Sequence, residues 1–291
     1  MARGIALAQV LAVASSPILT RIFGQDDFGK LGIFNSFTDI AAAVGALCYE
    51  MAIVTAATTH EAALLAVGCL ALSCLTGLLA SAALSGLITF EVLGLGSLPL
   101  WSVPIAFVTI VLGSLASQLR YWSIRESRYD LISHATVLRV GTRAAGQLGL
   151  GLLKAGWVGL LVGNLLGVIS GIWLMARQGY AGIKSALQPF RRSDVVRVLK
   201  TERKFPLYSC PSTLLNTLVL NLALPIIAAL HGLAVAGSYT LVQCAVSLPV
   251  GFISGSVADA FHGQVTVYAR ENRPALRGFL LKTAAQLLLL G

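Results

Sequence analysis

Nine long apolar stretches, separated by short connections, run through the 291 residues of the chain. Most of them reach the roughly 20 residues that an α-helix needs to cross the hydrocarbon core of a bilayer. The pattern predicts an all-α fold, a polytopic membrane protein with about nine transmembrane helices. The expected spans are Gly4 to Thr20, Leu31 to Tyr49, Ala62 to Phe90, Pro99 to Leu119, Ser133 to Leu153, Trp157 to Ala176, Phe205 to Leu230, Ala234 to Ala258 and Ala275 onward.

The composition supports this class of protein. Hydrophobic residues make up 56% of the chain and charged residues only 11%, whereas soluble domains carry about 25% charged residues. Too few polar residues remain to cover the surface of a soluble domain. No connection has room for a soluble catalytic domain.

Lysine and arginine fall on alternate connections between the spans. Fourteen lie on one set, with the largest group between Arg177 and Lys204, and three, Arg21, Lys30 and Lys154, lie on the other. Because cytoplasmic connections carry the excess of basic residues, the N-terminus is expected in the cytoplasm. The net charge of +9 is therefore explained by topology, and no nucleic-acid partner is expected.

Signatures of catalysis and metal binding are absent from the sequence. There is no Gly-x-Ser-x-Gly, P-loop, His-Glu-x-x-His or Cys-x-x-Cys pattern. The five cysteines lie in or beside apolar stretches and resemble small packing residues. We expect neither an enzyme nor a cofactor or metal site.

An internal repeat appears when the chain is aligned with itself at an offset of 208 residues. It pairs Pro17 with Pro225, Ile18 with Ile226, Gly24 with Gly232, Gly29 with Gly237, Asn35 with Gln243 and Asp39 with Ser247. Repeats at large offset in transporters build two bundles around a central path. The repeat predicts a six-helix bundle over residues 1–176, a basic cytoplasmic linker over 177–204 and an incomplete second bundle over 205–291. Two equal bundles would need about 416 residues, twice the offset, so the sequence is interpreted as truncated at its C-terminal end.

The first apolar stretch has a second interpretation. A basic start and Ala12-Val13-Ala14 before Ser15 resemble a secretory signal with its cleavage site. The repeat favours a true span, because it gives this stretch a counterpart later in the chain.

Ionisable residues inside the spans are the best candidates for a functional site, because charge within a bilayer is costly and usually faces a cavity or a partner. In the fifth span Arg139, Arg143 and Gln147 recur every four residues and form one polar stripe. A stripe of small residues, Gly141, Ala145 and Gly149, lies nearly opposite and is expected to pack against a helix. If the span starts at Ser133, Arg143 lies roughly 15 Å along it. The alternative is that both arginines extend to the membrane surface.

Polar residues of other spans complete the candidate set. Asn35 and Asp39 lie one turn apart in the second span, where Asp39 is expected to pair with an arginine of the fifth span; the alternative is a proton carrier. The seventh span contributes Asn216 within a polar stripe that either joins helices or binds substrate. Four glycines of the sixth span, Gly159, Gly163, Gly167 and Gly171, predict close packing of a neighbouring helix.

Several segments resemble one family of proteins. The first is Ser16-Pro17-Ile18-Leu19-Thr20-Arg21-Ile22-Phe23 followed by Asp26-Asp27-Phe28-Gly29; the others are Tyr49-Glu50-Met51-Ala52-Ile53-Val54, Lys204-Phe205-Pro206-Leu207-Tyr208-Ser209 with Pro211 and Asn216, and Ala236-Gly237-Ser238-Tyr239 through Pro249. Together they resemble bacterial polysaccharide biosynthesis proteins, the O-antigen and exopolysaccharide flippases of the multidrug/oligosaccharidyl-lipid/polysaccharide exporter superfamily.

The resemblance implies two helix bundles around a central cavity in the bacterial inner membrane. It also implies translocation of undecaprenyl-diphosphate-linked oligosaccharide units, with membrane lipids and possible polysaccharide polymerase or assembly proteins as partners. Arginines in the cavities of related flippases engage the diphosphate, which makes Arg139 and Arg143 the candidates here, followed by Arg21. The family's last spans are missing from this sequence.

Two other functions compete with this one. A multidrug or cation exporter of the same superfamily would prefer cationic compounds. A membrane-embedded glycosyltransferase or polymerase would need acidic or histidine-bearing catalytic loops, and the outer connections of this chain have almost no such residues. A remnant that no longer transports is compatible with each of the three.

Overall fold

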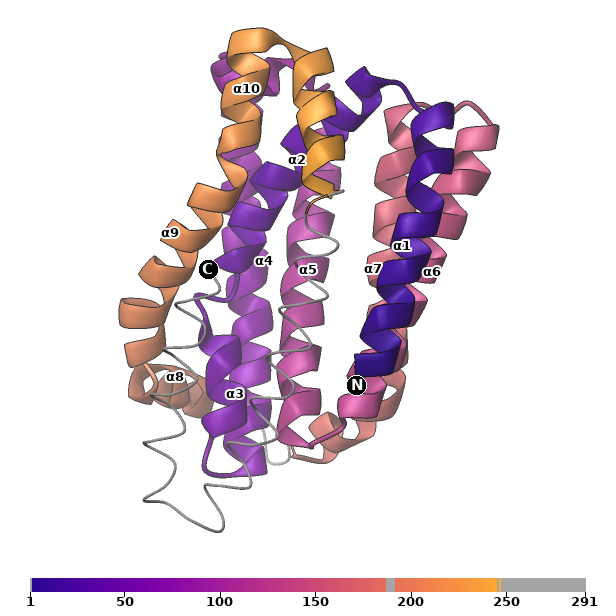
Figure 1. Cartoon of the computed structure of the whole chain (residues 1–291). Coiled ribbons are helices and arrows are strands. Elements are labelled where there is room, and N and C mark those ends of the chain that lie inside the picture. Colours follow the sequence, from indigo (N-terminus) through magenta and orange to yellow (C-terminus); the bar gives the residue numbers. More distant parts are fainter. Residues whose placement is uncertain (1, 187–191, 245, 247–291) are drawn as a thin grey trace, which may run out of the picture. The chain divides into compact units, whose positions relative to one another are not determined.

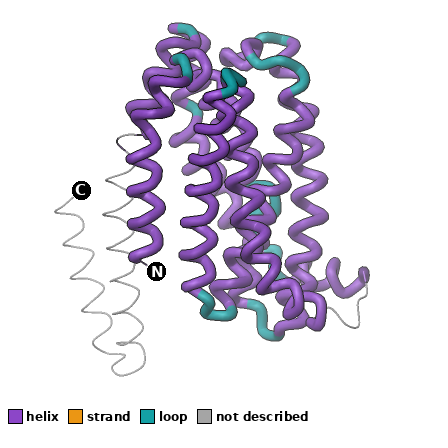
Figure 2. Tube along the Cα trace, turned by 90° about the vertical axis from the view of Figure 1, so that its right-hand side faces the viewer, coloured by secondary structure: helices purple, strands orange, loops and turns teal. Residues whose placement is uncertain are grey.

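The computed structural model describes residues 2–186, 192–244 and 246, which form helices joined by turns, with no strand among them (Figures 1 and 2). The chain divides into two units, and residues 3–245 belong to the first. The all-helical prediction is confirmed for the described residues. Most of the eighth expected span and all of the ninth lie outside them.

The helices have the following bounds. They are α1 Ala2–Ile22, α2 Gln25–Ala43, η1 Tyr49–Met51, α3 Ala52–Thr55, α4 Thr59–Thr89, η2 Val92–Ser97, α5 Ser102–Arg125, α6 Tyr129–Leu152, α7 Trp157–Ala186, α8 Arg192–Thr201, the π-helix η3 Phe205–Ser209, α9 Cys210–Asn221, α10 Ala223–His231 and an unlabelled helix, Leu233–Cys244. In each of the first eight apolar stretches, most of the described residues are therefore helical. Helix also fills most of the expected linker, as the end of α7 and as α8.

Four of the described helices are long and apolar enough to cross a membrane. They are α4, α5, the Trp157–Gly179 part of α7, and the Phe205–His231 segment that contains η3, α9 and α10. The protein is therefore a membrane-embedded helical protein. The other expected spans with described residues are shorter or more polar. Helices α2 and α6 are more polar because they contain the charged and amide side chains that are candidates for function.

Helix α2 starts six residues earlier than expected, at Gln25 rather than Leu31. Gly24 is the N-cap, and its N–H donates to the Asp27 carboxylate at 3.2 Å. The other oxygen of Asp27 accepts the N–H of Trp157 at 3.0 Å, at the first residue of α7. One carboxylate thus caps two helices, where the N–H groups of a first turn lack partners within the helix.

Helix α2 also ends earlier than expected, at Ala43 rather than Tyr49. Leu47 and Cys48 then adopt left-handed conformations, with φ of 51° and 59°, which few residues other than glycine adopt. Contacts from α4 and α5 hold this connection in place. Thr76 donates to the carbonyl of Gly45 at 2.6 Å, and the Arg125 guanidinium donates to the carbonyls of Ile53, Val54 and Ala56 at 2.7–3.2 Å.

Helices α6 and α7 form the most extensive contact between helices of the described chain. A Cβ added at Gly163 would lie 2.7 Å from the backbone nitrogen of Gln147, and one added at Gly167 would lie 2.7 Å from the carbonyl oxygen of Arg139. Both distances are shorter than real Cβ atoms tolerate. The glycines of α7 therefore allow the close packing that the sequence predicts.

The face of α6 that receives α7 differs from the expected one. The α7 glycines pack on the side that carries Arg139, Arg143 and Gln147, whereas a Cβ added at Gly141 or Gly149 would meet no described atom within 4 Å. The prediction that the stripe of Gly141, Ala145 and Gly149 forms the helix contact of α6 is therefore wrong for the described residues. The close contact is made by glycines of α7 and by Gly146 of α6, where an added Cβ would lie 3.2 Å from the Cα atom of Gly163.

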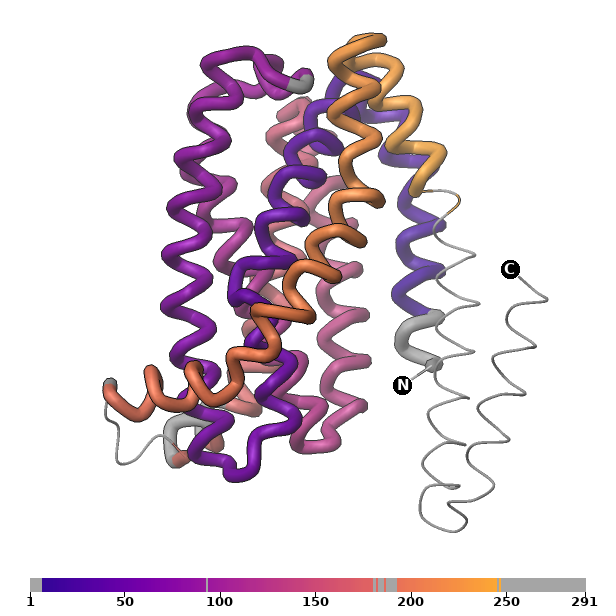
Figure 3. The backbone as a smooth tube through the Cα atoms, turned by 90° about the vertical axis from the view of Figure 1, so that its left-hand side faces the viewer, coloured from indigo at the N-terminus to yellow at the C-terminus, as the bar shows by residue number. Residues whose placement is uncertain are grey.

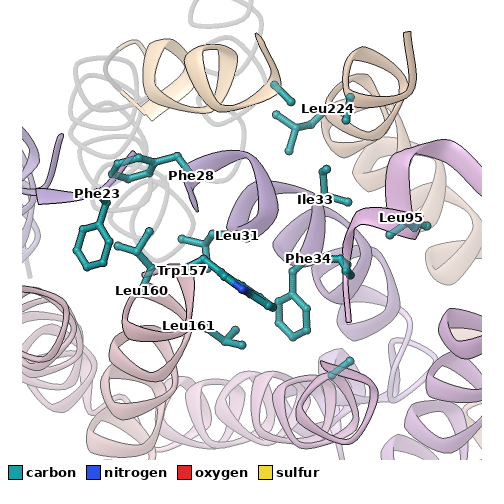
Figure 4. Packing of buried hydrophobic residues seen from close by; sticks show 14 of the residues in the cluster. Phe23, Phe28, Leu31, Ile33, Phe34, Leu95, Trp157, Leu160, Leu161 and Leu224 are labelled. Carbon is teal, nitrogen blue, oxygen red and sulfur yellow. The ribbon is translucent and has the colours of Figure 1, made fainter. Parts of the chain in front are cut away.

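A hydrophobic cluster joins α2 and α7 to the segment after α1 and to α10 (Figure 4). Leu31 and Phe34 of α2 meet Trp157 and Leu161 of α7 there, all at most 8% exposed. The Trp157 ring also stacks on Trp101, with ring centroids 5.0 Å apart.

The helices after α8 pack against α2. Helix α9 contacts α2, and α10 contacts both α2 and η2. A Cβ added at Gly29 of α2 would meet the backbone of Leu233 and of Gly237, its partner in the proposed repeat. Helix α2 and helix Leu233–Cys244 therefore cross at Gly29 and Gly237, the two glycines that the repeat pairs.

The α6–α7 contact predicts that Ala lowers the melting temperature at one glycine and does not lower it at another. Ala is favoured over Gly in a helix by up to about 1 kcal/mol. We expect Gly167→Ala to lower the thermal stability of the purified protein despite this gain, because the methyl group collides with the Arg139 carbonyl and overpacking costs about 1–3 kcal/mol. Gly149→Ala, in open space on α6, is the matched control and should not lower the melting temperature. Equal effects at both sites would contradict the packing.

Candidate functional site

Four of the predicted site residues occupy two helices that α7 connects. Arg139 and Arg143 lie on α6, Asn35 and Asp39 lie on α2, and α7 contacts both helices. The amide of Asn164 on α7 donates to the Asn35 side-chain oxygen at 3.5 Å. The structure thus brings the polar residues of the second and fifth spans to neighbouring positions around one helix.

The two arginines lie well inside α6. Because α6 begins at Tyr129 rather than Ser133, Arg143 lies roughly 21 Å and Arg139 roughly 15 Å from its start, at 1.5 Å per residue. The whole helix of 24 residues is roughly 36 Å long by the same rise. Both arginines therefore occupy the middle part of the helix.

Arg139, Arg143 and Asp39 form an electrostatic cluster. All three are exposed to solvent in the described structure although many protein atoms surround them, and the charges of both arginines act on Asp39. Asp39 makes no ion pair within 4.0 Å among the described residues. The direct pairing expected from the sequence is therefore replaced by an interaction at longer range, which leaves the guanidinium groups accessible to a ligand.

The remaining predicted site residues lie elsewhere. Gln147 is buried, and its side-chain amide donates to the Leu160 carbonyl at 3.1 Å, so it joins α6 to α7 instead of facing solvent. Arg21 at the end of α1 and Asn216 on α9 are exposed. No described hydrogen bond or ion pair connects either of them with the cluster.

Glu50 is a buried acid that the sequence analysis did not select. It lies in the connection between α2 and α4 and is 7% exposed, and its Oε2 atom has no hydrogen-bond partner in the described structure. Its charge acts on Cys69 of α4, Tyr121 of α5 and Cys210 of α9. Burial raises the pKa of the Glu50 carboxyl above its ordinary value of 4.5. In the sequence, Glu50 stands at the end of an apolar stretch and within the motif Tyr49-Glu50-Met51-Ala52-Ile53-Val54, but neither signal indicates that it is buried.

Other features of the described residues give no second candidate for chemistry. A surface depression of about 420 Å³ lies over α8, and another of about 350 Å³ lies between η2 and the end of α10. Neither includes the arginines of α6. No three His, Cys, Asp or Glu residues gather closely enough to hold a metal ion within the part of the chain that the structure describes.

Comparison with known proteins gives no match, whether the chain is compared with protein-family models, with curated proteins or with solved structures. The candidate site therefore rests on its own residues and on the sequence motifs.

Burial of Glu50 predicts a pH dependence of stability. Because its pKa is raised in the folded state, the folded chain holds this proton more tightly than the unfolded chain does. The stability that the protonated Glu50 contributes is therefore lost as the pH rises from about 4.5, its ordinary pKa, through its raised pKa in the folded state. Glu50→Gln cannot ionise, so we expect it to flatten the fall in melting temperature with pH and to stabilise the protein at about pH 8 by on the order of 1–3 kcal/mol.

The control for this measurement is Glu91→Gln. Glu91 is exposed, so its substitution should leave the pH profile of the melting temperature unchanged. A Glu50→Gln profile identical to that of the wild type would contradict the assignment.

Proposed function

We propose that the chain translocates undecaprenyl-diphosphate-linked oligosaccharide units across the bacterial inner membrane for the synthesis of O-antigen or exopolysaccharide. The observation that carries this proposal is the accessible pair Arg139 and Arg143, one turn apart in the middle of α6 in a membrane-embedded protein. The sequence motifs resembling polysaccharide flippases support it.

The chemistry of the two arginines suits a diphosphate. Residues four apart on a helix lie about 5–6 Å from each other at Cβ, so two guanidinium groups on one face reach neighbouring phosphates. Guanidinium forms paired, charge-assisted hydrogen bonds with phosphate oxygens. A charged headgroup with a polar glycan cannot cross hydrocarbon without such partners, whereas its lipid tail stays in the bilayer.

The charge of the cluster favours anions over cations. Two guanidinium groups face one carboxylate, Asp39, so the cluster carries a net charge of +1. A cation exporter would need an acid without competing arginines nearby. Asn35 lies one turn before Asp39 on α2, and its side chain accepts a hydrogen bond from the Asn164 amide. Such amides can form neutral hydrogen bonds with sugar hydroxyls.

The proposal includes more membrane spans than the four helices that are long and apolar enough to cross a membrane. Nine spans, an N-terminus in the cytoplasm and two bundles joined by the basic linker follow from the apolar stretches, the alternation of Lys and Arg, and the internal repeat. The crossing of α2 and helix Leu233–Cys244 at Gly29 and Gly237 supports the repeat.

The test measures ligand binding to the chain in lipid nanodiscs. We expect undecaprenyl diphosphate to bind and undecaprenol to bind far more weakly, because only the former carries phosphate. Arg139→Gln and Arg143→Gln should each weaken diphosphate binding by roughly 10- to 100-fold, since a hydrogen bond to a charged group contributes about 1.5–3 kcal/mol. Arg143→Lys, which keeps the charge and loses the paired geometry, should show a smaller loss.

Lys154→Gln is the charge-matched control, because Lys154 is exposed in the connection between α6 and α7. It should leave binding unchanged. Equal binding of undecaprenol and undecaprenyl diphosphate would contradict the proposal that Arg139 and Arg143 bind the diphosphate. Preference for tetraphenylphosphonium over the diphosphate would reassign the protein to the cation exporters.

A further inference from the structure

We propose that α8 and the residues that follow it form a binding surface for the headgroups of anionic phospholipids at the membrane interface. The inference rests on the membrane-spanning helices and on the contacts of α8. It does not depend on the transported substrate.

Helix α8 lies across α4 rather than along it (Figure 3). The crossing point is Gly68, where an added Cβ would lie 3.1–3.2 Å from Leu199 and Val195 of α8. The Tyr49 hydroxyl fixes the same turn of α8, because it donates to the Leu199 carbonyl at 3.0 Å. Helix α8 is therefore held at one level of α4.

Placing residues 69–89 of α4 in the hydrocarbon core puts that level at the start of the core. Helix α4 has 31 residues and is roughly 46 Å long, about 16 Å more than the hydrocarbon core of a bilayer. Beyond Gly68, residues 69–89 of α4 form roughly 31 Å of helix, which matches one core thickness. If this part of α4 fills the core, α8 lies where phospholipid headgroups begin.

The two faces of α8 suit this position. Val195, Val198 and Leu199 point toward α4 and the hydrophobic cluster around it. The opposite face is exposed, and the depression of about 420 Å³ lies along it. Hydroxyl, cationic and apolar side chains line that depression: Ser193, Val196, Arg197, Lys200 and Thr201.

The charge of this region favours an anionic ligand. Residues 193–204 contain four cations and two carboxylates. Each carboxylate has a cation already, with Asp194 3.2 Å from Arg197 and Glu202 3.7 Å from Lys204. Lys200 and Arg203 are exposed and make no ion pair with any described residue.

The side chains that follow α8 in the chain favour a lipid as the source of the anion. Tyr208, in the π-helix that follows, is 78% exposed, and Leu207 beside it is 62% exposed. Tyrosine is enriched at membrane interfaces, where its ring meets lipid and its hydroxyl meets water. A free phosphate ion would gain nothing from these apolar groups.

The experiment measures lipid binding to the purified chain by native mass spectrometry. The probes are phosphatidylglycerol, which is anionic, and phosphatidylcholine, which has no net charge. The test variant is Lys200→Gln with Arg203→Gln. The matched control is Lys30→Gln with Lys154→Gln, which removes the same charge from the first part of α2 and from the connection before α7.

We expect the wild type to bind phosphatidylglycerol more tightly than phosphatidylcholine. The test variant should lose about fivefold in phosphatidylglycerol affinity for each cation removed, whereas the control should keep its affinity. Lys200→Arg with Arg203→Lys, which keeps the charge, should also keep the binding and shows that α8 remains folded. Equal binding of the two lipids, or equal losses in the test and control variants, would overturn the inference.

Discussion

The close contact between α6 and α7 is the interaction on which the candidate site depends. Within lipid, helices gain little from the hydrophobic effect and associate where small residues let their backbones approach. Gly163 and Gly167 provide this approach, and they set which face of α6 is covered. Gln147, near the end of that face, becomes a buried link to α7, whereas Arg143 and Arg139 remain accessible beside it. The position of the charges therefore follows from glycines on another helix.

The motifs that resemble polysaccharide flippases mostly serve the architecture. Asp27 caps α2 and α7 together, and Tyr49 ties the connection after α2 to α8. Both act on backbone groups at places where a helix begins or a chain crosses another. Residues with such roles belong to the fold, and they do not by themselves indicate a function. The proposed transport depends instead on Arg139 and Arg143, which lie outside those motifs.

The sequence predicted the existence of the helices better than their ends and faces. Apolar runs located every described helix expected to cross the membrane, because length and hydropathy are local properties. The ends of α2 depended on distant groups, such as the Thr76 hydroxyl that bonds the Gly45 carbonyl. The contact face of α6 depended on the glycines of α7, and the burial of Glu50 depended on a turn that no local pattern indicates. Periodicity alone showed that Arg139 and Arg143 share a face; the helix that covers that face had to come from the structure.

The arrangement of charges in the candidate site is poorly suited to stability alone. A structural ion pair in a membrane protein reduces the cost of its charges when the partners are in contact and their net charge is zero. Here Asp39 is outside contact distance of both arginines, and the three groups leave one positive charge without compensation. A diphosphate would supply the missing negative charge and the missing hydrogen bonds at once. Binding of a diphosphate would then recover the free energy that the uncompensated charge costs, as the proposed function requires.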